Sequence, residues 1–139
     1  MAKKKDKKRL TLLGKSETQI PTAPSAKILE TFPNPADRPY WIQFHSADFT
    51  SLCPITGQAD FAEITIDYVP NERCLETKSL KFYLASYRNE KAFNEKVTNR
   101  VLDDLVAACA PRKMLIKAEF ASRGGIALSI TAMFPDAEE

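Results

Sequence analysis

The sequence predicts an α+β domain in which two helices cover one face of a four-stranded, largely antiparallel sheet. Two observations carry this prediction. Apolar residues alternate with polar ones in four segments, which is typical of strands, and between the second and third of these they recur at helical spacing. The predicted order is therefore strand, strand, helix, helix, strand, strand.

The first two predicted strands cover residues 40–45 and 62–68. Their apolar rows are Tyr40, Ile42 and Phe44, and then Ala62, Ile64, Ile66 and Tyr68. A loop is expected over Thr50–Ala59, and Pro70-Asn71 ends the second strand. On the polar face of the first strand, His45 is favoured as a locally bonded strand histidine over a catalytic one.

Both predicted helices carry an apolar stripe. The stripes are Leu80, Tyr83, Leu84 and Tyr87, and then Phe93, Val97, Val101, Leu102, Leu105 and Cys109. Pro111 ends the second helix. Because Cys109 belongs to the second stripe, it is predicted to be a core residue.

Alternation returns over residues 114–120 and 126–132, on either side of a turn at Arg123-Gly124-Gly125. An open four-stranded sheet has two edges with unpaired backbone groups. Joining sheets edge to edge into a barrel is the simplest way to pair these groups, so a homo-oligomer is expected.

The length of 139 residues, with 44% hydrophobic and 27% charged residues, indicates one globular domain. Residues 37–135 are expected to form it, preceded by a tail and irregular arm over 1–36 that Ile28, Leu29 and Phe32 anchor. The first nine residues are lysine-rich, and a solvated tail is favoured over nucleic-acid contact because no aromatic residue is interleaved. The sequence has neither a membrane span nor a signal peptide, so a cytoplasmic location is expected.

The three cysteines are Cys53, Cys74 and Cys109. Their odd number and wide spacing argue against a disulfide framework and against a C-x-x-C site. With a single histidine, a zinc site would need scattered ligands, so no metal is expected. Cys74 is predicted to be a buried structural thiol.

Cys53 lies in the segment FTSLCPITGQADF, within the predicted loop after the first strand. Rigid polar loops on a scaffold often carry nucleophiles, although spacing alone leaves an incidental cysteine as the alternative. Asp60 opens the next strand and could lie close to Cys53. An ionised carboxylate raises the pKa of a nearby thiol, so Asp60 fits only as a proton relay.

Two helix openings carry further polar residues. In ETKSLKFY, residues 76–83, Lys78 and Lys81 share a helix face and could hold phosphates together with free backbone N–H groups. A plain amphipathic helix with solvated lysines is the alternative. Phe93-Asn94-Glu95 opens the second helix, where Glu95 serves either the helix dipole or an amino-pyrimidinone ring edge.

Together these segments resemble the NADPH-dependent 7-cyano-7-deazaguanine reductases of queuosine biosynthesis, the QueF family, in its short single-domain form. The resemblance covers roughly residues 46–134. FTSLCPITGQADF is similar to the family's nucleophile loop, ETKSLKFY to its NADPH signature, FNE to its Phe-His-Glu, and SRGGI to its Arg-Gly-Gly turn.

The resemblance implies the tunnelling fold, whose ββααββ subunits form barrels with active sites at subunit interfaces. It implies that Cys53 attacks the nitrile to give a thioimide, that Asp60 shuttles protons, and that NADPH supplies two hydrides. The implied substrate-binding residues are Glu76, Ser79, Phe93, Asn94 and Glu95, and the implied cofactor-binding residues are Lys78, Lys81, Arg123 and Gly124. The sequence has no G-x-G-x-x-G loop, so no Rossmann unit is expected to hold the cofactor.

One departure from the family concerns Asn94, which stands where the family carries histidine. An amide cannot transfer a proton near neutrality, so turnover is expected to be slower if that position acts on protons and unaffected if it only orients the substrate. Two alternatives to the reductase remain open. One is a non-redox relative that passes the same nitrile to an amine, and the other is a module that binds a deazapurine without turnover.

Overall fold

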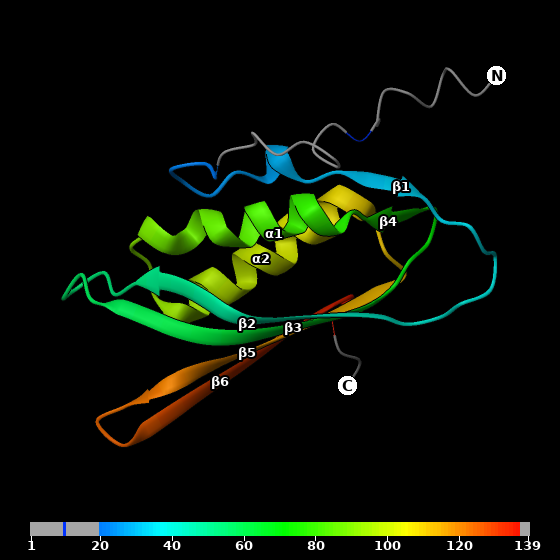
Figure 1. Cartoon of the computed structure of the whole chain (residues 1–139). Helices are drawn as coiled ribbons and strands as arrows, with labels where there is room; N and C mark the ends of the chain where they lie inside the picture. The colour runs from blue at the N-terminus through cyan, green and yellow to red at the C-terminus, as the bar shows by residue number, and fades with distance from the viewer. Residues whose placement is uncertain (1–9, 11–19, 137–139) are drawn as a thin grey trace.

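The computed structural model describes residue 10 and residues 20–136, and within them the predicted order of the long elements is confirmed. The long elements are β2 (Ile42–Leu52), β3 (Ala59–Val69), α1 (Thr77–Ala85), α2 (Asn94–Cys109), β5 (Lys113–Arg123) and β6 (Ile126–Phe134). The strands form one antiparallel sheet in the order β2-β3-β5-β6. Figure 1 shows both helices on the same face of this sheet. The fold class is α+β, as predicted.

The core lies between the helices and the two central strands. The inward rows of β3 and β5 pair in register, so that Ile64 lies opposite Ala118 and Tyr68 opposite Met114. Each fully buried aliphatic side chain stabilises such a core by about 1.5–3 kcal/mol. Cys109 lies in this core and is 1% exposed, as its place in the apolar stripe predicts. Burial raises its pKa to about 12.

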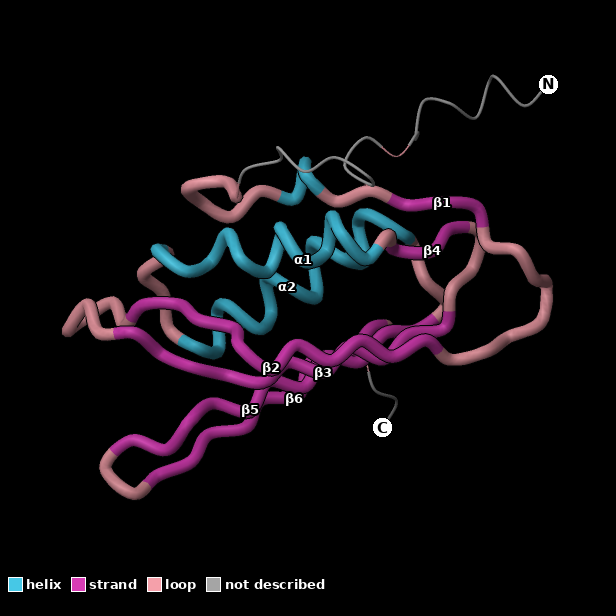
Figure 2. The backbone as a smooth tube through the Cα atoms, in the orientation of Figure 1, coloured by secondary structure: helices cyan, strands magenta, loops and turns pink. Residues whose placement is uncertain are grey.

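Two short strands, β1 (Thr31–Pro33) and β4 (Arg73–Leu75), form a second antiparallel sheet. Figure 2 shows it on the side of the main sheet that the helices cover. The sequence pattern missed both strands because three residues are too few to show alternation. Ile28 and Leu29, in and just after η2 (Ala26–Ile28), pack against the core as expected. Phe32 is 36% exposed, and its backbone lies opposite Cys74 in the pairing of β1 with β4.

The expected tail over residues 1–9 and 11–19 lies outside the described residues. Among the residues that are described, no helix is both long and apolar enough to cross a membrane.

The loop between the first two long strands is shorter than expected. Ser51 pairs with Asp60 and Leu52 with Ala59, so only residues 53–58 remain outside the ladder. A bulge between Ser46 and Phe49 shifts the alternation, which hid the second half of β2 from a period-two pattern.

The last two strands form a hairpin that extends past the helices, where Ile126 is 74% exposed (Figure 1). Its turn is Gly124-Gly125 alone, because β5 includes Arg123. Both glycines have positive φ, at 57° and 83°, a backbone conformation that other residues rarely adopt.

Candidate active site

The Cys53 loop closes on itself through two backbone hydrogen bonds. The Cys53 N–H donates to the Gln58 carbonyl at 2.8 Å, and the Gly57 N–H donates to the Cys53 carbonyl at 2.9 Å. Gly57 has a φ of 74°, which lets the chain reverse within the loop. The Cys53 thiol is partly exposed, whereas Cys74 and Cys109 are buried. This arrangement leaves one accessible thiol on a tightly held loop.

Hydrogen bonds inside the loop lower the pKa of the Cys53 thiol. The Thr56 hydroxyl contributes most, followed by the backbone N–H groups of Thr56 and Ile55, and together they outweigh burial and the Asp60 charge, which raise it. A lower pKa enlarges the thiolate fraction at neutral pH, and the thiolate is the nucleophilic form. The sequence-based reasoning found the opposing effect of Asp60 but missed Thr56. The sequence signal for this role is a hydroxyl residue three positions after the cysteine in a tight loop, where it can donate a hydrogen bond to the thiolate.

Asp60 is the second residue of β3, and its side chain is 12% exposed. The Arg123 guanidinium contacts it, with 3.1 Å between Nε and the Asp60 Oδ1. Arg123 also donates through Nη1 to the Gln58 Oε1 at 3.0 Å and through Nη2 to the Ala59 carbonyl. Arg123, which was expected to bind cofactor, therefore contacts the stem of the Cys53 loop in this chain.

The segment before α2 runs beside the end of β2. The Leu52 N–H donates to the Glu90 carbonyl at 2.9 Å, and the Ala92 N–H donates to the Leu52 carbonyl at 3.1 Å. This ladder places Phe93-Asn94-Glu95, at the beginning of α2, next to the Cys53 loop. The structure thus brings together two of the three polar segments that the sequence singled out.

Unsatisfied hydrogen-bonding groups mark this end of the molecule. Within the described residues, two buried side-chain oxygens have no hydrogen-bond partner, the Ser51 Oγ and the Asn94 Oδ1. Leaving such a group unpaired costs about 1–3 kcal/mol, so it calls for a ligand or a water molecule. Phe93 is 59% exposed, and Glu95 is exposed in the first helical turn. These features suit a site that accepts a polar, planar ligand.

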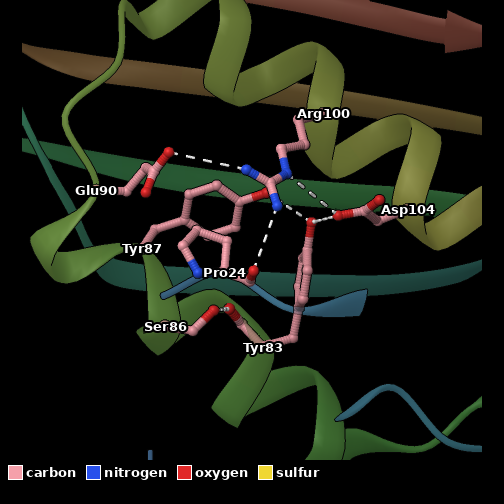
Figure 3. Close-up of polar contacts among 7 residues, drawn as sticks. All are labelled: Pro24, Tyr83, Ser86, Tyr87, Glu90, Arg100 and Asp104. Atoms are coloured by element: carbon pink, nitrogen blue, oxygen red, sulfur yellow. Dashed lines mark hydrogen bonds and ion pairs between the residues drawn. The ribbon is translucent and has the colours of Figure 1, made fainter. Parts of the chain in front are cut away.

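A network around Arg100 of α2 includes Glu90, which lies in the segment before α2 that runs beside β2 (Figure 3). The Arg100 guanidinium lies 3.8 Å from the Glu90 carboxylate and 3.7 Å from the Asp104 carboxylate, and it donates to the Pro24 carbonyl at 3.3 Å. The Tyr83 hydroxyl donates to Asp104 at 2.6 Å. Tyr83, the last aromatic residue of ETKSLKFY, is therefore a buried structural residue.

The beginning of α1 is closed by its own residues. The Glu76 carboxylate accepts hydrogen bonds from the backbone N–H groups of Lys78 at 2.8 Å and Ser79 at 2.7 Å. The Ser79 hydroxyl accepts from the Glu30 N–H at 3.0 Å. The expectation that these N–H groups are free to hold phosphates is wrong, because the Glu76 carboxylate occupies them. Glu76 and Ser79 are 4% and 0% exposed.

Lys81 lines a cavity of about 490 Å³ between α1 and β2, together with Arg88, Thr77 and Asp48. Two cations at its wall suit an anionic ligand such as a dinucleotide phosphate. Among the described residues that line this cavity, Cys53 is absent. Figure 1 shows the β2–β3 loop at the opposite end of the molecule from β4 and the start of α1. A single chain therefore does not bring Glu76 and Lys78 to Cys53.

Two further expectations concern His45 and a metal site. His45 bonds to the Thr65 hydroxyl at 2.9 Å and to the Glu63 carboxylate at 3.1 Å, which confirms the local role expected for it. The described part of the chain holds no group of histidine, cysteine and acidic side chains that could bind a metal ion.

Comparisons with known proteins identify the family of this chain. The family model described as "QueF-like protein" matches residues 59–139. A protein of an Anaeromyxobacter species named NADPH-dependent 7-cyano-7-deazaguanine reductase is 55% identical over 114 residues, which cover 81% of this chain and 93% of that protein. A Syntrophus aciditrophicus protein of the same name is 50% identical over 130 residues, covering 93% of this chain and 89% of that protein.

The crystal structure of the archaeosine synthase QueF-Like in its apo form superimposes with a TM-score of 0.67 at 21% identity, covering 73% of this chain and 99% of that one. At this identity the match shows the fold, and it confirms the predicted tunnelling fold of the subunit. The chain belongs to the QueF-like family, and its similar relatives are NADPH-dependent 7-cyano-7-deazaguanine reductases.

Proposed function

We propose that this chain reduces the nitrile of 7-cyano-7-deazaguanine to an aminomethyl group with NADPH, in the queuosine pathway of tRNA modification. The observation that carries the proposal is the Cys53 loop, where hydrogen bonds from Thr56 and Ile55 lower the pKa of a partly exposed thiol. The relatives' shared name supplies the substrate and the cofactor. The three cysteines are free thiols, which supports a reducing compartment such as the cytoplasm.

In the proposed reaction the Cys53 thiolate attacks the nitrile carbon, forming a C–S bond while the nitrile nitrogen takes up a proton. Asp60, at the stem of the loop, accepts the thiol proton and delivers it to that nitrogen. NADPH, when bound, would supply the two hydrides that the reduction takes, and the two accompanying protons would come from solvent. Cys53 leaves as thiolate between the two reductions, which restores the enzyme.

The substrate is proposed to bind at the beginning of α2. Glu95 accepts hydrogen bonds from the amino-pyrimidinone edge, and Asn94 uses the oxygen that lacks a partner among the described residues. The exposed ring of Phe93 offers a surface against which a planar base can pack. The cations Lys78, Lys81 and Arg88 on the α1 side are proposed to contact the cofactor phosphates, and Arg123 and Gly124 are proposed to contact the cofactor from the hairpin beside the Cys53 loop.

We infer further that the complete site is shared between subunits of a homo-oligomer. The nucleophile loop and the start of α1 lie at opposite ends of one chain, so the start of α1, with Glu76, Ser79 and Lys78, is proposed to lie at the site of a neighbouring subunit (Figure 1). Glu76 and Ser79 are engaged in capping, and their contribution is therefore to hold α1 and its lysines in place. The edge strands β2 and β6 and the exposed side chains Trp41 and Phe61 support such an assembly.

The proposal is tested by incubating the purified protein with 7-cyano-7-deazaguanine, with and without NADPH, while following nicotinamide absorbance and intact mass. We expect a substrate-sized mass gain that Cys53→Ala abolishes, and about two NADPH oxidised per nitrile, because nitrile-to-amine reduction takes four electrons. An adduct without NADPH oxidation would point to the amine-transferring relative. Ligand binding with neither adduct nor oxidation would leave a binding module.

A further inference from the structure

Arg123 holds the stem of the nucleophile loop with every nitrogen of its side chain. Nε lies 3.1 Å from the Asp60 Oδ1, Nη1 donates to the Gln58 Oε1 at 3.0 Å, and Nη2 donates to the Ala59 carbonyl. These three partners are consecutive in sequence, and they join the Cys53 loop to β3. A planar guanidinium that makes three contacts fixes both position and orientation, which a lysine cannot do.

The backbone of β5 is shaped to direct this side chain. The pairing of β5 with β6 is irregular between Phe120 and Arg123, and such bulges re-aim the side chains that follow them. Gly124 and Gly125 then reverse the chain through positive φ angles. The hairpin thus presents Arg123 to β3, a neighbour in the sheet.

The contacts of Arg123 reach Cys53 in one further step. The Gln58 whose side chain binds Arg123 also accepts, through its carbonyl, the hydrogen bond of the Cys53 N–H at 2.8 Å. Fixing Gln58 therefore fixes the loop whose Thr56 and Ile55 groups stabilise the thiolate. The Arg123 charge also lies against the Asp60 carboxylate, whose negative charge raises the pKa of the Cys53 thiol.

We propose that Arg123 is a positioning residue for the nucleophile, holding the Cys53 loop and neutralising Asp60 before any cofactor binds. This goes beyond the cofactor-binding role proposed above and rests on contacts inside one chain. A phosphate that draws Arg123 away has to break these three contacts, so cofactor binding and the reactivity of Cys53 are coupled.

The test uses iodoacetamide and the full-length protein without substrate or NADPH, so it does not depend on the proposed reaction. The rate of Cys53 alkylation is measured against pH by peptide mass for wild type, Arg123→Gln and Arg123→Lys. We expect Arg123→Gln to slow alkylation near neutral pH by about threefold to tenfold and to move its midpoint to higher pH, because a tenfold loss of thiolate follows each unit of pKa increase. Arg123→Lys should give an intermediate alkylation rate, since lysine keeps the positive charge but cannot make the three guanidinium contacts.

Lys117→Gln is the matched control, because Lys117 lies on the same strand in an exposed ion pair with Glu119 at 3.4 Å. Its alkylation profile should equal that of wild type. If Arg123→Gln misfolds, as circular dichroism would reveal, Arg123→Lys carries the test. Wild-type alkylation rates in the folded Arg123 variants, with only a weaker affinity for NADPH in a binding titration, would overturn the proposal.

Discussion

Glu76 and Ser79 hydrogen-bond to each other twice at the beginning of α1. The Glu76 carboxylate accepts from the Ser79 N–H at 2.7 Å, and the Ser79 hydroxyl donates to the Glu76 carbonyl at 3.0 Å. The same carboxylate accepts from the Lys78 N–H. The acidic residue of the ETKSLKFY segment therefore acts first on its own helix, and the helix N-terminus is closed to phosphate by that carboxylate.

Replacing Glu76 by alanine should destabilise the fold, because two N–H groups of the first turn lose their acceptor. We expect the free energy of unfolding to fall by about 1–2 kcal/mol, measured by urea denaturation. Glu72→Ala is the control, since Glu72 is exposed and uses its backbone carbonyl to bind the Asn34 N–H. A variant with wild-type stability and a higher KM for the nitrile would show that the carboxylate serves the ligand instead.

Thr56→Val should make Cys53 less reactive. The Thr56 hydroxyl is the largest cause of the lowered pKa of the Cys53 thiol, so its loss raises that pKa and reduces the thiolate fraction at neutral pH. The alkylation midpoint should move to higher pH, as followed by the pH dependence of iodoacetamide labelling. Thr56→Ser keeps the hydroxyl and should restore the wild-type profile. An unchanged midpoint in Thr56→Val would assign the lowered pKa to the backbone N–H groups alone.

Asn94→Ala should raise the KM for the nitrile substrate more than it lowers kcat. The Asn94 Oδ1 is buried and has no partner among the described residues, so it is available to bind a ligand donor. A side-chain amide acts neither as an acid nor as a base near neutrality, so its loss removes binding rather than proton transfer. Steady-state kinetics separates the two, with Asn99→Ala as the control because its side chain donates to the exposed Glu95 carbonyl. A fall in kcat with unchanged KM would contradict this view.

The fold should lose stability in alkali through the buried tyrosines. Burial raises the pKa of Tyr87 from its ordinary value of 10 to about 12, and burial also raises that of Tyr83. Since both are neutral in the folded protein, their stabilising contribution is complete below about pH 10 and is lost as the pH rises toward 12. Urea denaturation at stepped pH, combined with tyrosinate absorbance, measures this loss. Tyrosinate formation at the ordinary pH without any loss of stability would contradict it.

Local periodicity was enough to predict the order of the long elements, their inward faces and the core position of Cys109. This periodicity involves only residues close together in the sequence. It arises because each strand or helix buries one face, regardless of how distant segments pack. The Cys53 loop and the beginning of α2 were singled out as a candidate site because their polar residues fit neither a core nor a solvated face, and their roles stay predictions.

Only the tertiary structure decided which distant residues meet. The β1–β4 pair joins residues 31–33 to 73–75, and Arg123 of β5 contacts Asp60 of the neighbouring strand β3. No local pattern in the sequence indicates either contact. The role of Glu76 was also decided only by the structure, since a carboxylate at the beginning of a helix is equally consistent with a helix cap and with a ligand-binding group. Such choices depend on the geometry of packing between segments far apart in the chain, which composition and periodicity do not encode.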